Sequence, residues 1–428
     1  MKRTFKNIQF YIGFASLAII TSCAPEIEGI ETTAGKANFS KYIAIGNSLT
    51  AGYADGGLYL EGQQVAYPNL IAEQLQSVGG GTFRSPFFPQ EQRNGSGYIQ
   101  LKALVDGQPT MENVTSNLAY RGPGLLTKYT DEVENLGVPG MRLDLSGYAP
   151  FGALNMYLER LLPDAEVGQK SYTDFVLNRN HTFFSFWLGN VDVLGYATNG
   201  AFEESPTTVL TSTAAFNALY NNFIDALTAN GQKGVVATIP NVTAIPFFNT
   251  VTTERIVAGV STATGGAFTK VYISTSSGAR EATNEDLFGL TFPTDTLGKT
   301  SNGIPGYGLS PLNPLHDKFV LDKDEIVEIS NRINEFNHII KTVAENKGLA
   351  LADAHAYLNR VKSSGINYNG IGINASFITG NAFSLDGVHL TPIGNALIAN
   401  LFIDAINETY GSKITKVNVA QYRGVKFP

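Results

Sequence analysis

Short apolar runs that alternate with segments of helical periodicity constrain the fold of this chain more than any other feature. Helical spacing is clearest where Phe216, Leu219, Tyr220 and Phe223 recur at intervals of three and four residues. Four predicted strands cover Tyr42–Ile45, Thr182–Leu188, Gly234–Ile239 and Leu349–Ala352. One more strand, the second along the chain, is predicted to end near Asn135–Gly140. One predicted helix begins at Pro68. The other predicted helices cover Phe151–Leu162, Phe216–Leu227, Ile326–Val343 and Pro392–Asn407.

Strands that alternate with helices predict one α/β domain with a parallel sheet. The chain has 428 residues, 43% of them hydrophobic, which is ample for a large core. Two stretches rich in small and polar residues, about 79–128 and 247–321, are interpreted as long loop insertions. Functional groups in such folds lie at the carboxyl ends of the strands.

The first residues have the pattern of an export signal rather than of the fold. Lys2, Arg3 and Lys6 precede a mostly apolar run that is too short to span a membrane. The run ends in small residues before Cys23, which resembles a bacterial lipobox, and that resemblance implies cleavage and lipidation at Cys23. An ordinary secretory signal with an incidental cysteine is the alternative. Residues 1–22 are therefore interpreted as the signal peptide, 23–40 as a flexible tether and 41–428 as the domain.

Acyl chains at Cys23 would anchor the mature protein to a membrane, since two or more chains hold a protein stably. The expected location is the cell envelope, at the outer membrane, with the leaflet left open. The formal net charge of −7 argues against a nucleic-acid partner. The single cysteine excludes an intramolecular disulfide.

In the stretch YIAIGNSLTAGY, Tyr42–Tyr53, Ser48 lies just after the first predicted strand and directly before a helix-like segment. A serine on such a turn has an exposed hydroxyl and a nearby backbone N–H. Attack on an ester carbonyl needs both groups, one as nucleophile and one to stabilise the oxyanion. By itself, a Gly-x-Ser turn is more often only a turn or a helix cap.

A second candidate pair lies near the other end of the chain, where Asp386 precedes His389 by three residues at the start of the last helix. A carboxylate there can fix the tautomer of the imidazole and leave its other nitrogen free to take a serine proton. The alternative is that Asp386 is a turn residue and His389 a helix-start residue.

Four short blocks together resemble the SGNH, or GDSL, hydrolases. They are Gly46-Asn-Ser-Leu49, Asn135-Leu-Gly-Val-Pro-Gly140, Leu188-Gly-Asn-Val-Asp192 and Asp386-x-x-His389, in the family's order. The resemblance implies a three-layer α/β/α, flavodoxin-like fold with a five-stranded parallel sheet. It also implies Gly140 as a backbone donor to the oxyanion. The lipobox and the phrasing GNSLTAGYADGGLY are similar to lipoprotein members from Bacteroidetes-type bacteria.

The sequence departs from the family pattern at two positions. Asn47 stands where an Asp is usual, in a role that shapes the turn. Strict alignment of the third block places Val191 at the position of the family's oxyanion-hole Asn, and a valine cannot donate a hydrogen bond. Asn190 sits one residue early and serves only if the turn is reshaped; a structural turn residue is the equal alternative. A lost donor costs roughly 10²–10³ in rate.

The resemblance implies a serine esterase or lipase that cleaves carboxylic esters through an acyl-serine. Ser48, His389 and Asp386 would be nucleophile, base and orienting acid, and the N–H groups of Ser48 and Gly140 with the Asn190 amide would form the oxyanion hole. Expected substrates are lipids, short acyl esters or acylated glycans, without metal or organic cofactor. The alternative is a weakened member of the fold that binds glycan or lipid at the surface without turnover.

Overall fold

The computed structural model describes residues 31–105 and 108–428, and residues 32–428 form one compact unit. The predicted signal peptide 1–22, the lipidation site Cys23 and the tether up to residue 30 lie outside the described residues. Within the described residues, no helix combines the length and the apolar character needed to cross a bilayer.

A five-stranded parallel sheet forms the centre of the unit, in the order β13-β8-β7-β1-β6. The sheet confirms the predicted fold class. Strand β1 lies between β7 and β6 and is fully buried, and Gly46 at its end pairs with Gly137 of β6 on one side and Trp187 of β7 on the other. The strands are β1 Tyr42–Gly46, β6 Asn135–Gly137, β7 Phe183–Trp187, β8 Lys233–Ala237 and β13 Ala350–Ala352.

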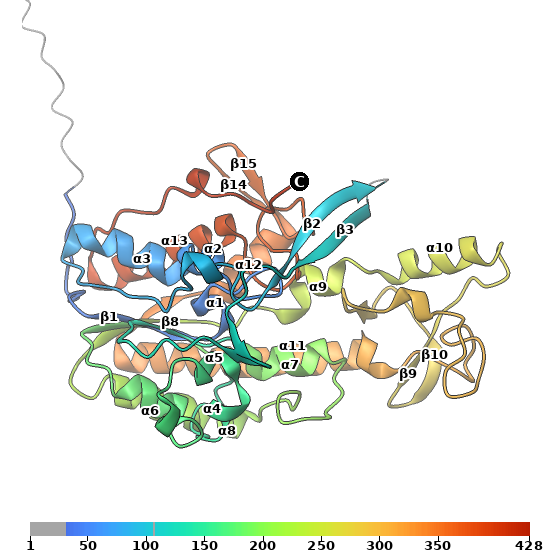
Figure 1. Ribbon diagram of the computed structural model, residues 1–428, viewed down its shortest axis with the longest axis horizontal. Coiled ribbons are helices and arrows are strands. Elements are labelled where there is room, and N and C mark those ends of the chain that lie inside the picture. The colour runs from blue at the N-terminus through green and yellow to red at the C-terminus, as the bar shows by residue number, and fades with distance from the viewer. Residues whose placement is uncertain (1–30, 106–107) are drawn as a thin grey trace, which may run out of the picture. The chain divides into compact units, whose positions relative to one another are not determined.

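Helices cover both faces of the sheet, with α3 and α13 on one side and α8 and α11 on the other (Figure 1). The Phe216 and Phe336 rings stack 3.8 Å apart and join α8 to α11. Thr391 accepts a hydrogen bond from Gly394 N–H, as expected of the cap of α13. The helices are α3 Tyr67–Leu75, α8 Thr213–Leu227, α11 Lys323–Lys347 and α13 Pro392–Tyr410.

The single helix predicted over Phe151–Leu162 is wrong, because Asn155 divides it. Asn155 has an extended backbone, and its Oδ1 accepts from the N–H groups of Tyr157 and Leu158. An asparagine side chain offers the backbone an alternative to helical bonding, which starts a new helix here. The two short helices are α4 Phe151–Leu154 and α5 Met156–Glu159.

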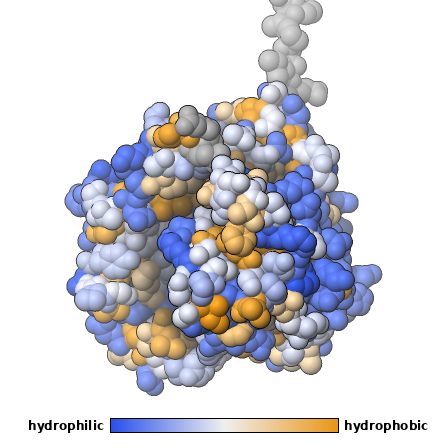
Figure 2. Space-filling model, turned by 90° about the vertical axis from the view of Figure 1, so that its right-hand side faces the viewer, coloured by the Kyte–Doolittle hydropathy of each residue, from blue (hydrophilic) through white to orange (hydrophobic). Residues whose placement is uncertain are grey.

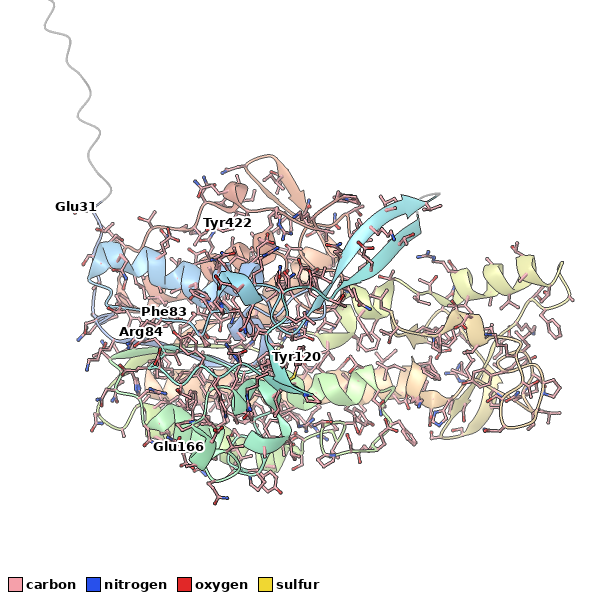
Figure 3. All side chains as sticks on the ribbon, in the orientation of Figure 1. Glu31, Phe83, Arg84, Tyr120, Glu166 and Tyr422 are labelled. Carbon is pink, nitrogen blue, oxygen red and sulfur yellow. The ribbon has the colours of Figure 1, made fainter. Side chains whose placement is uncertain are left out.

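The stretch 79–128 carries a hairpin and two short strands. Two of its aromatic residues, Phe83 and Phe88, pack onto the domain, whereas Phe87 is exposed. Phe83, which is labelled in Figure 3, stacks on Tyr42, the first residue of β1. Their ring centroids are 5.0 Å apart, and Phe88 is buried. The strands are β2 Tyr98–Val105, β3 Gln108–Val114, β4 Tyr120–Gly122 and β5 Leu125–Leu126.

The stretch 247–321 builds a small hydrophobic core of its own, in which Ile256, Ile273 and Phe288 are buried. A groove of about 1160 Å³ runs between α10 and the β2–β3 hairpin. Figure 2 is a view of the molecule from the right-hand side of Figure 1, and it shows separate apolar patches among polar residues. The elements here are α9 Pro246–Asn249, α10 Thr253–Ala263, β9 Tyr272–Thr275, β10 Gly278–Glu281, β11 Leu287–Phe288 and β12 Val320–Leu321.

The packed unit begins before residue 41, so the last part of the predicted tether 23–40 belongs to the fold. Phe39 is only 1% exposed and packs edge-on against Phe183 of β7. Lys36 N–H also donates to Tyr410 O at the end of α13. The remaining helices and strands are α1 Ser48–Ala51, α2 Leu60–Gln64, α6 Tyr172–Leu177, α7 Val191–Thr198, α12 Ala354–Ser363, β14 Ile366–Tyr368 and β15 Ile371–Ile373.

Candidate active site

Ser48 is the first residue of α1 and follows the carboxyl end of β1 without a spacer other than Asn47. Asn47 caps the helix, and its Oδ1 accepts from Leu49 N–H at 3.3 Å. The Ser48 N–H lies in the first helical turn, where the backbone donors have no acceptor inside the helix. Among the described residues, neither this N–H nor Ser48 Oγ has a hydrogen-bond partner, so both are available to a ligand.

Asp386 and His389 lie on the loop that leads into α13, and they contact each other directly. His389 Nδ1 is 2.9 Å from Asp386 Oδ2. The other carboxylate oxygen, Asp386 Oδ1, accepts from the N–H groups of Val388 and His389. A carboxylate at Nδ1 holds the imidazole in the tautomer whose Nε2 accepts a proton. His389 Nε2 has no hydrogen-bond partner among the described residues.

Asp386 remains ionised because its neighbours outweigh its burial. Burial alone would raise the pKa of this carboxyl. The nearby His389 and the hydrogen bonds from the His389 ring and from the backbone N–H groups together hold the pKa well below its usual range. The carboxylate is therefore negative at every pH at which an imidazole changes its charge.

The loop after α1 contacts the Asp386 loop through several hydrogen bonds, although the two are far apart in sequence. Gly56 N–H donates to Asp386 Oδ2 at 2.9 Å, across 330 residues. Leu385 N–H donates to Asp55 Oδ1, and Asp55 N–H donates to Ser384 Oγ. These bonds connect the segment that carries Ser48 to the segment that carries His389.

Ser48, Asn190 and His389 line one cavity of about 40 Å³ at the carboxyl end of the sheet. Among the described residues that line it, these three alone have polar side chains; the other ten are apolar. Three polar groups that converge in an apolar cavity are typical of a ligand site. The structure thus brings together candidates from the first, third and fourth sequence blocks.

Asn190, and not Val191, faces this cavity. Gly189 precedes it with φ of +107°, and a Cβ on Gly189 would come within 2.6 Å of the Phe216 ring. Only glycine fits this turn, and the turn leaves Asn190 as the residue before α7. Val191 begins the helix and does not line the cavity. The strict family alignment therefore names the wrong residue of the pair for contact with the cavity.

Asn47 orients the Asn190 side chain. Because Leu49 N–H occupies Asn47 Oδ1, the Asn47 Nδ2 is the atom that faces Asn190 and donates to its Oδ1. Asn190 consequently keeps its own Nδ2 as a donor for a ligand. Asn47, which replaces the Asp usual in the family, thus orients Asn190, the residue next to the second departure at Val191.

Gly140 follows β6, the neighbour of β1, and lies outside the lining of the small cavity. Asn155 Nδ2 donates to Pro139 O at 2.8 Å. The C=O of Pro139 and the N–H of Gly140 belong to one trans peptide and point in opposite directions. Asn155 therefore turns the Gly140 N–H away from itself, and this N–H has no acceptor among the described residues.

A buried ionic cluster joins the segments after β6 and β7. Asp192 on α7 accepts from the N–H groups of Leu143 and Asp144, and Arg142 pairs with Asp144 at 2.6 Å. Burial, together with Asp144, raises the pKa of Asp192 to about 6. The cluster holds the turn of Gly140 against the start of α7, directly after Asn190.

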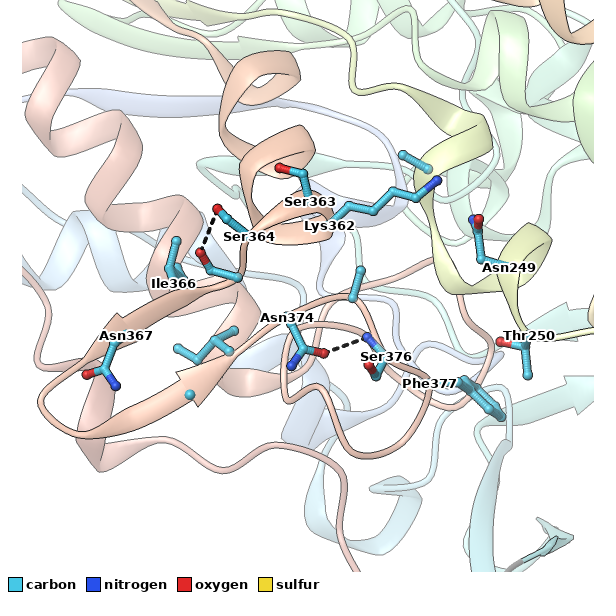
Figure 4. Close-up of a pocket in the computed structure, with 15 residues that line it drawn as sticks. Asn249, Thr250, Lys362, Ser363, Ser364, Ile366, Asn367, Asn374, Ser376 and Phe377 are labelled. Atoms are coloured by element: carbon cyan, nitrogen blue, oxygen red, sulfur yellow. Dashed lines mark hydrogen bonds between the residues drawn. The ribbon is translucent and has the colours of Figure 1, made fainter.

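A larger, open cleft of about 640 Å³ lies at the end of α12, beside β14 and β15 (Figure 4). Its polar side chains bond mostly to the backbone of their own turns. Asn249 Nδ2 donates to Thr243 O and Ile245 O, and Asn374 Oδ1 accepts from Ser376 N–H. None of the predicted site residues that the structure describes lines this cleft.

Sequence reasoning missed three residues that hold candidate site residues in place: Asp55 and Ser384 at the Asp386 loop, and Asn155 beside Gly140. Asp55 precedes two glycines and has φ of +53°, so its turn was detectable as an Asp-Gly signal. Its partners 330 residues away left no such signal. Within the described residues, no group of three His, Cys, Asp or Glu side chains is placed to hold a metal ion.

One family of known proteins matches most of the chain. The family model for GDSL-like lipase/acylhydrolase matches residues 42–402. The chain is similar to the solved structure of a lipase/acylhydrolase from Enterococcus faecalis, with 13% identity and a TM-score of 0.33 over 88% of this chain and 99% of that chain. An extracellular lipase from Streptomyces rimosus has 13% identity and a TM-score of 0.34 over 89% of this chain and 100% of that chain. A catalytic mutant of an acetylxylan esterase from Geobacillus stearothermophilus has 11% identity and a TM-score of 0.36 over 89% of this chain and 98% of that chain. No curated protein matches the chain significantly. The chain belongs to the GDSL-like lipase/acylhydrolase family.

Proposed function

We propose that this protein is a serine ester hydrolase that cleaves carboxylic esters through an acyl-serine intermediate. Membership of the family supports ester hydrolysis in general. The observation that carries the serine mechanism is the single cavity lined by Ser48, Asn190 and His389, with Asp386 bonded to the far side of the imidazole.

In the first step, Ser48 Oγ attacks the ester carbonyl carbon while His389 Nε2 takes the hydroxyl proton. The carbonyl oxygen becomes an oxyanion, which accepts hydrogen bonds from the N–H groups of Ser48 and Gly140 and from Asn190 Nδ2. The tetrahedral intermediate collapses as the bond to the alcohol oxygen breaks. His389 gives its proton to that oxygen, and the alcohol leaves.

In the second step, water attacks the acyl-serine and His389 takes the proton of the water. The second tetrahedral intermediate releases the carboxylic acid, and the proton returns to Ser48 Oγ. Asp386 stabilises the imidazolium that forms in each step and does not itself take the proton. Water is the one co-reactant of the two steps.

The test is hydrolysis of p-nitrophenyl butanoate by the full-length chain in detergent, with Ser48→Ala beside it. We expect Ser48→Ala to lose about 10⁴-fold or more of kcat. Ser364→Ala, an exposed serine of the open cleft, is the matched control and should retain the wild-type rate.

A fluorophosphonate probe separates this function from surface binding without turnover. Covalent labelling of Ser48 with measurable turnover supports the hydrolase. A folded wild-type protein that neither turns over ester nor takes the label at Ser48 would overturn the proposal and favour a protein that binds glycan or lipid.

We also propose that Cys23 carries a lipid that anchors the protein in the cell envelope, at the outer membrane. The basic first residues, the short apolar run and the small residues before Cys23 support this proposal. Expression in a bacterium with labelled palmitate should label the wild type and leave Cys23→Ala unlabelled and in the soluble fraction. Equal labelling of both proteins would contradict lipidation at Cys23.

A further inference from the structure

We infer that the cavity beside Ser48 is an acyl pocket that selects esters of short carboxylic acids, with acyl chains of about four carbons or fewer. This inference rests on the proposed function and adds the substrate class to it. It comes from the size, lining and position of the cavity.

The lining of the cavity favours an apolar guest. Leu49, Leu194, Val242 and Leu358 are among the ten apolar residues around it, and they come from α1, α7, the turn at Val242–Ala244 and α12. No Asp, Glu, Lys or Arg of the described chain lines the cavity. A polar or ionic acyl group would lose its hydration here without gaining partners, which costs free energy.

The volume of the cavity limits the length of that guest. A single water molecule requires roughly 10–15 Å³ of such space. The cavity of about 40 Å³ therefore holds about three water-sized groups, which matches the carbons of a butanoyl chain beyond its carbonyl. The rest of a longer chain would have to extend out of the cavity into solvent, where it gains no burial, or displace packed side chains, which protein interiors resist.

The position of the cavity assigns it to the acyl part of the ester and not to the alcohol. Ser48 and Asn190, which would hold the carbonyl carbon and its oxygen, lie in its wall. The acyl group stays bonded to Ser48 Oγ until water arrives, whereas the alcohol leaves in the first step. A small cavity with a buried wall, in which Trp187 is 1% exposed, suits the group that stays.

Two leucines from different helices close the pocket and provide its test. Leu358 lies on α12 and Leu194 on α7, and both are partly exposed. Truncation of either side chain to alanine enlarges the cavity from a different side. A change in chain-length preference that both variants share would therefore come from the enlarged pocket and not from a local distortion.

The experiment measures kcat/KM of the full-length chain on p-nitrophenyl acetate, butanoate, octanoate and dodecanoate. We expect the wild type to lose at least about tenfold between butanoate and octanoate, since one methylene more or less in a hydrophobic pocket changes this constant about 10- to 200-fold. Leu358→Ala and Leu194→Ala should each raise the ratio of octanoate to acetate about tenfold.

Leu219→Ala is the matched control, because Leu219 is a partly exposed leucine of α8 that packs on the core away from the cavity. It should leave the chain-length ratio as in the wild type. Near-ultraviolet circular dichroism checks that each variant is folded.

The outcomes separate the two proposals. Turnover that depends on Ser48 but is equal or faster on dodecanoate overturns the short-acyl pocket and leaves the hydrolase intact. An unchanged ratio in both folded leucine variants also overturns the pocket. No turnover of any ester by a folded wild type overturns the hydrolase and the pocket together.

Discussion

The small cavity at Ser48 and the open cleft at the end of α12 differ in how their polar groups are held. At the cavity, Asn47 bonds Asn190 across 143 residues and Gly56 bonds Asp386 across 330. At the cleft, Asn249 reaches carbonyls only four and six residues away. The cleft is the larger of the two by volume, about 640 against 40 Å³.

Convergence of polar side chains from distant segments, rather than volume, distinguishes the candidate site from the open cleft. Bonds within a turn satisfy the polar groups of that turn and leave nothing aimed at a common point. Bonds between distant segments hold side chains from several elements in one place, which catalysis requires. Substitutions at the cavity should therefore lower activity far more than substitutions at the cleft.

Asp386→Asn should have the largest effect. The asparagine amide has a single oxygen, which cannot accept from His389 Nδ1 and also keep the bonds to the backbone N–H groups, so the imidazole loses its tautomer and its counter-charge. We expect kcat to fall about 10⁴-fold, as in other triads that lose this carboxylate. Steady-state kinetics with p-nitrophenyl butanoate measures the change. A loss below about tenfold would show that Asp386 does not orient His389.

The same variant should also change the acid dependence of stability. The pKa of Asp386 is lowered in the folded state, so its stabilisation is complete above the unfolded pKa, about 4, and is lost as the pH falls toward the folded pKa. Between about pH 4 and 2 the wild type should lose up to about 1.4 kcal/mol per pH unit from this group. Urea unfolding across this range should show a shallower slope in Asp386→Asn; equal slopes would contradict the ionised pair.

Asn190→Ala should lower kcat about 10²–10³-fold, which is the usual cost of one oxyanion donor. The KM should change little, because the donor acts mainly on the charge that develops in the transition state. Val191→Ala, next in the chain but outside the cavity lining, is the matched control. A larger loss of kcat in Val191→Ala than in Asn190→Ala would show that Asn190 is not the oxyanion donor.

Asn47→Asp, which restores the residue usual in the family, should lower kcat by about tenfold, less than the loss of the whole donor. A carboxylate accepts at both oxygens, so it would draw Asn190 Nδ2 away from the cavity. The exposed Asn230→Asp makes the same chemical change at a distance and should have no effect. A rate equal to or above that of the wild type in Asn47→Asp would show that Asn190 orientation does not depend on Asn47.

Lys362→Ala in the open cleft should change kcat/KM less than about twofold, as is usual for surface substitutions without a fixed partner. Lys362 is exposed and extends across the cleft in Figure 4. The measurement should include an acylated oligosaccharide beside p-nitrophenyl acetate. A large loss on the oligosaccharide alone would show that the cleft is part of the substrate site.

Much of the fold could be predicted because its signals are local. The five strands lie close to the predicted apolar runs, and Thr391 caps α13 as its sequence indicates. Periodicity and capping depend on residues close together in the chain, which the sequence displays directly. The prediction of one helix over Phe151–Leu162 was wrong because an asparagine can occupy a helix interior or a cap, and the sequence does not show that Asn155 is a cap.

The order of residues along the chain specifies which residue types follow the strands: Ser48 after the first strand, Gly140 after the second, Asn190 after the third and the Asp386–His389 pair before the last helix. Which of these residues come into contact depends on how the whole chain packs. The turn at Gly189 selects Asn190 over Val191, and packing between segments 330 residues apart seats the Asp55 loop against Asp386. The physical reason is that a spacing fixes local geometry, whereas the direction of a side chain at a turn and its distant partners depend on the packed chain as a whole.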